Sequence, residues 1–135
     1  MPIVSEEEKR AVKQIAKAGF NAKITCLTRA LRKDIDAALD CDVWGVRISI
    51  PTGYLWRKYV INRPEQEIIG MGIETAQYAK DHGLYVIAST TDCTRAEIDH
   101  LKMVVSRLVK EAKVDQIRLP DTAGCITPIA MEYLV

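Results

Sequence analysis

The chain has 135 residues, of which 48% are hydrophobic and 27% are charged, and its formal net charge is +1 at pH 7. This length and balance are typical of one soluble globular domain, which we expect to span 1–135. Acids and bases are mixed along the chain, which argues against the basic surface of a nucleic-acid-binding protein. No apolar run approaches the roughly 20 residues of a membrane-spanning helix, and the N-terminus does not resemble a secretion signal. We therefore expect a cytoplasmic protein with neither a nucleic-acid nor a membrane partner.

The four cysteines show no pattern of a metal or redox site. None of Cys26, Cys41, Cys93 and Cys125 belongs to a Cys-x-x-Cys pair, and neither histidine is near one of them in the sequence. Zinc sites and dithiol redox motifs depend on such short spacings. We therefore expect four reduced thiols and no metal site.

Helices and strands alternate in the predicted secondary structure. Ser5 and Glu8 form a capping box that starts the first helix, and Gly19 ends it. A second capping box at Thr94 and Glu97 precedes a long apolar stripe at helical spacing. Strands are expected at 21–27, 44–50, 84–90 and 114–120, later helices at 32–41, 64–82, 94–112 and from Thr127 onward, and a loop at 51–64.

Single helices between strands predict parallel βα units, and two architectures fit this order: an open doubly wound sheet or part of a (β/α)8 barrel. No Gly-x-Gly-x-x-Gly turn follows a strand, which removes the main signal for dinucleotide binding. Strands covered on both faces should be almost continuously apolar. Here polar and apolar residues alternate, as in VRISI (46–50). We therefore predict the α/β fold class, with parallel (β/α) units forming a partial TIM barrel.

The same alternation places polar and cationic side chains on one face of the sheet. Lys23, Arg47 and Arg118 belong to this polar face. Because buried charges are costly without partners, the cations must meet negative groups. Two interpretations stay open: the cations bind an anion inside the barrel, or they pair with carboxylates elsewhere on the barrel wall.

Three stretches of the chain resemble one enzyme family in their order and spacing. They are NAKITCLTRALRKDIDAAL (21–39), ASTTDCTRAEIDHL (88–101) and LPDTAGCITP (119–128). Together they resemble the central part of the catalytic barrel of the isopropylmalate, homocitrate and citramalate synthases, which are related to hydroxymethylglutaryl-CoA lyase. The resemblance covers essentially the whole chain and implies that it supplies about strands three to six of a (β/α)8 barrel.

The resemblance implies an acyltransferase of amino-acid biosynthesis that joins acetyl-CoA to a small 2-oxo acid. A divalent metal, Mg, Mn or Zn, polarises the 2-oxo group in the full enzyme of this family. A base then takes a proton from the acetyl methyl group, the carbanion attacks, and the thioester is hydrolysed. This chemistry needs a Lewis acid, a base and a carboxylate-binding site. The implied partners of the full enzyme are therefore a 2-oxo acid and acetyl-CoA.

Five residues match positions of the family's substrate site. Thr122 matches the threonine that hydrogen-bonds the carboxylate of the oxo acid, and Asp121 matches the acid beside it. Ser89 and Arg29 match residues at strand ends, where active sites of such barrels lie. Arg47, on the inward face of its strand, is a candidate contact for the side-chain end of the oxo acid. For Asp121 and Thr122 the alternative is that they only hold the turn together.

Three positions near the end of the third predicted strand complete this set. Asp92 and Arg95 match an Asp and an Arg of the family, and the resemblance implies an ion pair that shapes the loop. Thr91 stands where family members usually have a Glu that lines the oxo-acid pocket. This difference implies either a changed substrate or the loss of ordinary activity.

The chain also departs from the family elsewhere. Tyr54 stands where a His is common after the fourth barrel strand. Homocitrate synthases carry an Arg near the start of the fifth-strand motif, where this chain has Ile87 and Ala88. Their presence counts against a dicarboxylic oxo acid, although Arg47 can substitute from the neighbouring strand. The family's Arg-Asp pair of the first strand and its His-x-His metal pair of the seventh are both missing.

We therefore expect no metal in this chain alone and no condensation activity from it. The leading hypothesis is a fragment of an acetyl-CoA-dependent synthase. The alternatives are a related carbon-carbon lyase or aldolase, and a non-catalytic half-barrel module. A half barrel leaves open sheet edges, so we expect either a fragment of a longer polypeptide or a homo-oligomer in which two copies associate.

Overall fold

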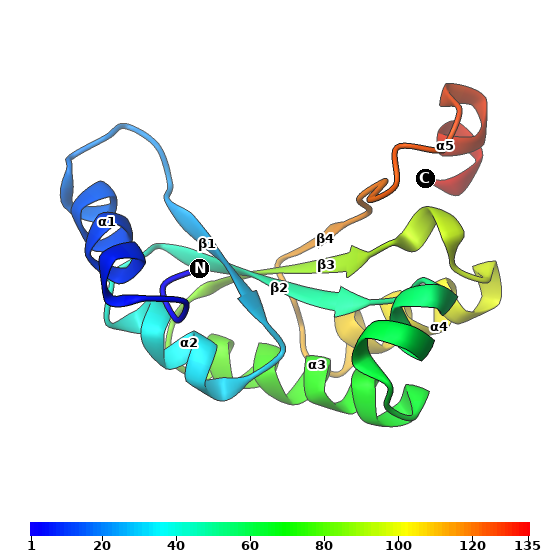
Figure 1. The fold of residues 1–135 in the computed structure, drawn as a ribbon, viewed down its shortest axis with the longest axis horizontal. Coiled ribbons are helices and arrows are strands. Elements are labelled where there is room, and N and C mark those ends of the chain that lie inside the picture. The colour runs from blue at the N-terminus through cyan, green and yellow to red at the C-terminus, as the bar shows by residue number, and fades with distance from the viewer.

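The computed structural model describes residues 1–135 and contains one four-stranded parallel sheet. Its strands lie side by side in chain order, β1-β2-β3-β4 (Figure 1). The strands are β1 (Thr25–Arg29), β2 (Gly45–Pro51), β3 (Tyr85–Thr91) and β4 (Gln116–Arg118). The helices are α1 (Glu6–Lys17), α2 (Arg32–Leu39), α3 (Glu65–Asp81), α4 (Ile98–Lys110) and α5 (Pro128–Leu134), with a π-helix η1 (Trp56–Ile61) and a 3-10 turn η2 (Cys93–Arg95).

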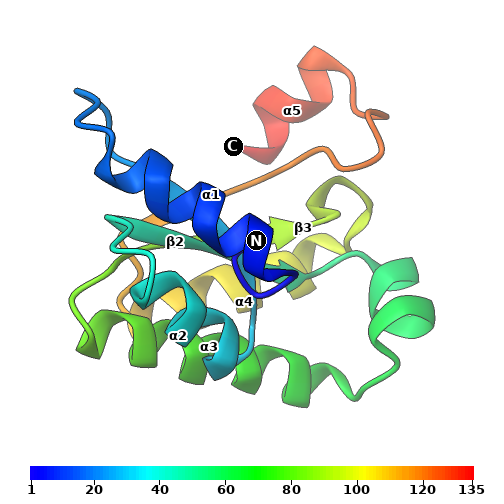
Figure 2. The same ribbon diagram turned by 60° about the vertical axis from the view of Figure 1, so that its left-hand side comes forward.

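The helices are distributed unequally over the two faces of the sheet. Helices α2, α3 and α4 lie on one side of it, while α1 lies beside the end where the strands begin and α5 beyond the end where they stop (Figures 1 and 2). A doubly wound sheet would reverse its strand order at a switch point. This sheet runs in one direction without a reversal, which is the order of a barrel wall. The structure thus confirms the predicted partial TIM barrel.

The hydrophobic core fills the space between the sheet and these three helices. Val46, Ile48 and Ala88 point toward the helices and are completely buried. Helix α3 comes close to the sheet because it presents small residues there. A Cβ atom added at Gly72 would lie only 3.0 Å from Cδ1 of Ile50. Burial of this one face gives the alternating pattern seen in the sequence.

The opposite face of the sheet, which we call the open face, carries the polar set. It consists of the strand residues of the other parity, namely Thr25, Leu27, Arg29, Gly45, Arg47, Ser49, Pro51, Tyr85, Ile87, Ser89, Thr91, Gln116 and Arg118. Three of these thirteen residues are arginines and none is acidic. The open face is therefore the side of the sheet on which a site for an anion is to be sought.

Two predictions of secondary structure were wrong: the start of the first strand, and the loop expected after the second strand. β1 begins at Thr25, which pairs with the first residue of β2, Gly45. Lys23 therefore lies outside the sheet, with its ammonium 5.6 Å from the ring centroid of Trp44, and not on the polar face. The expected loop at 51–64 contains the π-helix η1.

The two predicted capping boxes had different outcomes. The Ser5 hydroxyl accepts a hydrogen bond from the Glu8 N–H at 3.2 Å, so Ser5 caps α1 as predicted. Thr94 does not cap α4, because it lies within η2 and α4 begins only after Glu97. Its hydroxyl instead donates a hydrogen bond to Asp121 at 2.7 Å. The Thr94 hydroxyl therefore bonds a residue that is distant in the sequence, and not the N-terminus of α4 as the spacing suggested.

Candidate functional site

The strand register gathers four open-face residues into one row near the carboxyl ends of the strands. Arg29 is opposite Ser49, Ser49 is opposite Ser89, and Ser89 is opposite Arg118. Two of the predicted site residues, Arg29 and Ser89, therefore lie in the same row. Ser49 and Arg118, which the sequence comparison did not select as site residues, lie in it as well. Their alternation with apolar neighbours was the signal that identifies them.

A second row lies one step closer to the beginning of the strands. It contains Leu27, Arg47, Ile87 and Gln116 in register across the sheet. Arg47 thus lies one row deeper on the open face than Ser89. Three of the site residues predicted on the strands, Arg29, Arg47 and Ser89, therefore lie in two adjacent rows on one face.

Thr91 lies one step beyond the first row, at the end of β3. Its hydroxyl is 2.6 Å from the hydroxyl of Ser49 on the neighbouring strand. The carbonyl of Thr91 accepts hydrogen bonds from the N–H of Thr52 at 2.9 Å and from its hydroxyl at 3.2 Å. Where the family usually has a carboxylate, this chain has a pair of hydroxyls that is neutral and able to donate to an anion.

Arg29 has a charged partner within the chain. Its Nε and one terminal nitrogen donate to the carboxylate of Asp34 at 2.9 and 2.8 Å, and its backbone N–H donates to the same group at 3.0 Å. Asp34 is only 1% exposed. The hydrogen bond that Arg29 donates to this carboxylate raises the pKa of Arg29. The pair fixes the turn between β1 and α2, a structural function that the sequence comparison did not foresee.

Arg47 and Arg118 differ from Arg29 because neither guanidinium forms an ion pair or a hydrogen bond within the chain. Of the two interpretations left open by the sequence, pairing with carboxylates is therefore not realised among residues 1–135. Both guanidiniums keep all their donors available on the open face.

The turn after β4 holds the two remaining substrate-site candidates. Asp121 accepts hydrogen bonds from the Ile126 N–H at 3.0 Å and from the Thr94 hydroxyl at 2.7 Å. The Ile126 N–H, and to a smaller extent the Thr94 hydroxyl, hold the pKa of Asp121 below its usual value. The Thr122 hydroxyl accepts a hydrogen bond from the Asp92 N–H at 2.9 Å. Both residues therefore join the turn after β4 to the loop after β3.

Asp92 is the buried anchor of that loop. It is 0% exposed, has a left-handed backbone conformation with φ of 64°, and accepts a hydrogen bond from Arg95 Nε at 2.8 Å. Asp tolerates this conformation better than most residues. Gly53 packs against it so closely that a Cβ atom there would lie 2.0 Å from Asp92 Oδ2. The Asp92–Arg95 pair thus shapes the loop beside the strand ends.

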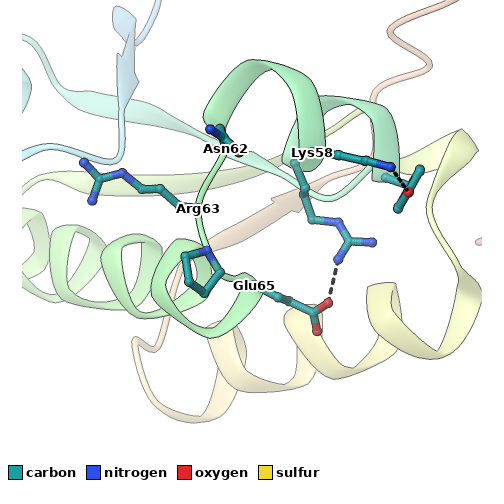
Figure 3. Close-up of a pocket in the computed structure, with 7 residues that line it drawn as sticks. Lys58, Asn62, Arg63 and Glu65 are labelled. Atoms are coloured by element: carbon teal, nitrogen blue, oxygen red, sulfur yellow. Dashed lines mark hydrogen bonds and ion pairs between the residues drawn. The ribbon is translucent and has the colours of Figure 1, made fainter.

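A separate polar cavity of about 340 Å³ lies between η1 and the start of α3 (Figure 3). Its cations have partners: Arg57 bonds Glu65 at 2.5 Å, and Lys58 bonds the Tyr54 hydroxyl at 2.9 Å. Behind it, Nδ1 of His100 lies 2.9 Å from the Glu65 carboxylate. No open-face residue lines this cavity. We interpret the charged side chains around this cavity as an ion-pair network that attaches η1 to α3 and α4.

The titratable residues of the chain do not form a metal centre. No group of three or more His, Cys, Asp or Glu side chains lies close enough together to hold a metal ion. None of the helices is long and apolar enough to cross a membrane.

The whole chain, residues 1–135, matches the model of the HMGL-like family. It is 47% identical over 134 residues to the homocitrate synthase AksA of Methanocaldococcus jannaschii, covering 98% of this chain and 33% of that protein. It is 41% identical over 134 residues to the 2-isopropylmalate synthase of the same organism, covering 99% of this chain and 26% of that protein. The chain thus spans about a third or less of the length of these curated relatives.

Solved structures show the same fold. The HMG-CoA lyase of Bacillus subtilis superimposes with a TM-score of 0.75 over 93% of this chain and 44% of that one, at 18% sequence identity. The Pseudomonas aeruginosa hydroxymethylglutaryl-CoA lyase superimposes with a TM-score of 0.72, over 94% and 43% of the two chains, also at 18% identity. The order of strands, the family motifs and these matches agree, and the chain belongs to the HMGL-like family.

Proposed function

We propose that this chain is the 2-oxo-acid-binding segment of an acyltransferase that condenses acetyl-CoA with a small 2-oxo acid. The observation that carries the proposal is the open-face row in which Arg29, Ser49, Ser89 and Arg118 lie together near the carboxyl ends of the strands. Active sites of (β/α)8 barrels are built at this end of the strands. The identity to homocitrate and isopropylmalate synthases supports the same assignment.

The chemistry of this row suits a carboxylate. The Ser89 and Thr91 hydroxyls are neutral donors, and the guanidiniums beside them are charged donors in a planar fork. The substrate carboxylate would meet these groups at the strand ends, beside the loop that Asp92 and Thr122 hold in place. The divalent metal that the condensation requires is assigned to parts of a longer protein, because residues 1–135 form no metal site.

Pyruvate, the smallest 2-oxo acid of the implied class, should bind the isolated chain without reacting. In an amide-detected NMR titration we expect the resonances of Ser89, Thr91 and Thr122 to shift, and those of the remote helix α1 to remain unchanged. The same sample, given acetyl-CoA with Mg²⁺, Mn²⁺ or Zn²⁺, should release no thiol above the blank, because residues 1–135 form no site that would hold the metal.

The variant Ser89→Ala serves as a control for the location of the bound pyruvate. It removes one donor from the row and should weaken pyruvate binding by roughly fivefold to tenfold, the loss of one hydrogen bond to a charged group. Shifts that spread evenly over the surface, or survive this substitution unchanged, would contradict the assigned site. Metal-dependent turnover would contradict the assignment of the chain as a binding segment alone.

A further inference from the structure

Arg57 joins the segments that follow two neighbouring strands. It belongs to η1, which comes after β2, and one of its terminal nitrogens donates to the carboxylate of Glu97 at 2.7 Å. Glu97 lies immediately before α4, at the end of the loop that follows β3. The other terminal nitrogen donates to Glu65 at the start of α3 (Figure 3). Only 12% of the Arg57 side chain is exposed, so its guanidinium is held between two carboxylates.

The loop after β3 also contacts the segment after β2 at its other end. Gly53 packs directly against Asp92, where that loop begins. The N–H of Arg57 donates to the carbonyl of Gly53 at 3.0 Å, so both contacts come from one turn of the chain. The loop 92–97 is therefore fixed at its first residue by packing and at its last residue by the ion pair between Glu97 and Arg57.

This loop directs the hydroxyl of Thr122. The Thr122 oxygen accepts a hydrogen bond from the Asp92 N–H at 2.9 Å, and the hydroxyl makes no other hydrogen bond within the chain. A hydroxyl has one proton to donate and two lone pairs that accept. Because the Asp92 N–H occupies a lone pair, the Thr122 proton remains free for a bound carboxylate. The orientation of that hydroxyl thus depends on where the loop 92–97 lies.

We infer that Arg57 is a positioning residue for Thr122. Its ion pair with Glu97 holds the loop after β3 where the Asp92 N–H meets the Thr122 hydroxyl. The inference rests on the proposed function, in which a carboxylate of the ligand binds at the strand ends. Arg57 is not part of the open face and needs no contact with the ligand. Loss of its charge should therefore weaken ligand binding only while the Thr122 hydroxyl is present.

A double-mutant cycle, measured by NMR titration of the complete chain with pyruvate, tests this coupling. Arg57→Gln keeps a long polar side chain without the charge and should weaken pyruvate binding roughly fivefold, part of the contribution of a hydrogen bond to a charged group. Thr122→Ala should weaken it at least as much. In the Thr122→Ala background, Arg57→Gln should change the affinity by less than about twofold, because the hydroxyl that it positions is absent.

Arg107→Gln is the matched control. Arg107 also connects α4 to α3, through a hydrogen bond to Gln66 at 3.2 Å, but its ion pair is with Glu111 at the far end of α4. It has no bond to the loop 92–97. Arg107→Gln should therefore leave the affinity for pyruvate unchanged.

Glu97→Gln removes the partner in the loop and leaves the pair between Arg57 and Glu65. The Glu97 side chain is 57% exposed, so the chain should fold with this substitution even if Arg57→Gln does not. Glu97→Gln should reproduce the effect of Arg57→Gln on pyruvate binding, and it should likewise have no further effect in the Thr122→Ala background.

Hydrogen exchange of the Asp92 amide gives a measurement that needs no ligand. This amide should exchange roughly tenfold faster in Arg57→Gln than in the wild type, and at an unchanged rate in Arg107→Gln. An unchanged rate in Arg57→Gln, or additive effects of Arg57→Gln and Thr122→Ala on pyruvate binding, would overturn the positioning role and leave the proposed function standing. If the wild-type chain binds no pyruvate, the proposed function fails, and the exchange rate alone decides whether Arg57 holds the loop.

Discussion

Replacing Gly53 with alanine is expected to lower the free energy of unfolding by about 3 kcal/mol, at the upper end of the cost of overpacking. The added methyl group would lie 2.0 Å from Asp92 Oδ2 and 2.8 Å from Asp92 Cβ. The added methyl group is too close to Asp92 Cβ as well as to the carboxylate. Rotation of the carboxylate therefore does not remove the clash. Asp92 must move as a whole, although Arg95 and its own burial hold it in place. Urea unfolding followed by the fluorescence of Trp44 and Trp56 measures the loss.

Gly70 provides the matched control for this substitution. It lies inside α3, and a Cβ atom there would meet no atom within 4 Å. Gly70→Ala should therefore stabilise the protein by about 0.5–1 kcal/mol, because alanine loses less backbone entropy in a helix. If Gly53→Ala is as well tolerated as Gly70→Ala, the close approach of the β2 and β3 loops is not as the structure describes.

Replacing Asp92 with alanine should cost about 2–3 kcal/mol, less than the full loss of a buried ion pair because Arg95 remains 39% exposed. The substitution removes the carboxylate that Arg95 binds. It also places an alanine at a φ of 64°, which is unfavourable for a residue with a Cβ atom and no polar group. The same unfolding measurement reports the loss, and its denaturant dependence should remain unchanged.

Asp92→Asn separates the charge from the backbone conformation. Asparagine also tolerates the left-handed region and keeps the shape of the side chain, so only the charge is lost. We expect Asp92→Asn to lower the free energy of unfolding by about 1–2 kcal/mol, which is less than the loss expected for the alanine variant. Alanine and asparagine variants of equal stability would mean that the backbone conformation contributes nothing at this position.

Local patterns predicted the face on which the site lies. The alternation around Arg47 and Ser49 placed both on one face, and the structure finds them there because only the other face meets helices. The matched motifs brought Thr122 and Asp92 to the ends of neighbouring strands, where a hydrogen bond joins them. Patterns of this kind succeed because strand periodicity and strand order are properties of short segments.

Contacts between residues that are distant in the sequence could not be predicted from such local patterns. The capping box at Thr94 was wrong because its hydroxyl bonds Asp121, 27 residues later. The burial of His100 against Glu65 depends on the packing of α4 beside α3, which spacing within α4 does not reveal. The absence of partners for Arg47 and Arg118 likewise depends on every other strand of the face. The sequence therefore predicted which residues share the open face but not the charge balance of that face.

The central claim is that this chain supplies the 2-oxo-acid-binding wall of an acetyl-CoA-dependent synthase barrel. Its most direct test replaces the matching segment of the M. jannaschii homocitrate synthase AksA, to which it is 47% identical over 134 residues, with this chain. In such a chimera β1 and β4 gain the neighbouring strands that each lacks in the isolated sheet.

The measurement is the rate of thiol release from acetyl-CoA by the purified chimera, with a 2-oxo acid and a divalent metal present. We predict a metal-dependent rate that requires the 2-oxo acid and falls by at least tenfold in the Thr122→Ala chimera, since a hydrogen bond to the substrate carboxylate is lost. A chimera that unfolds cooperatively, as a folded protein does, yet releases no thiol with any 2-oxo acid would contradict the claim.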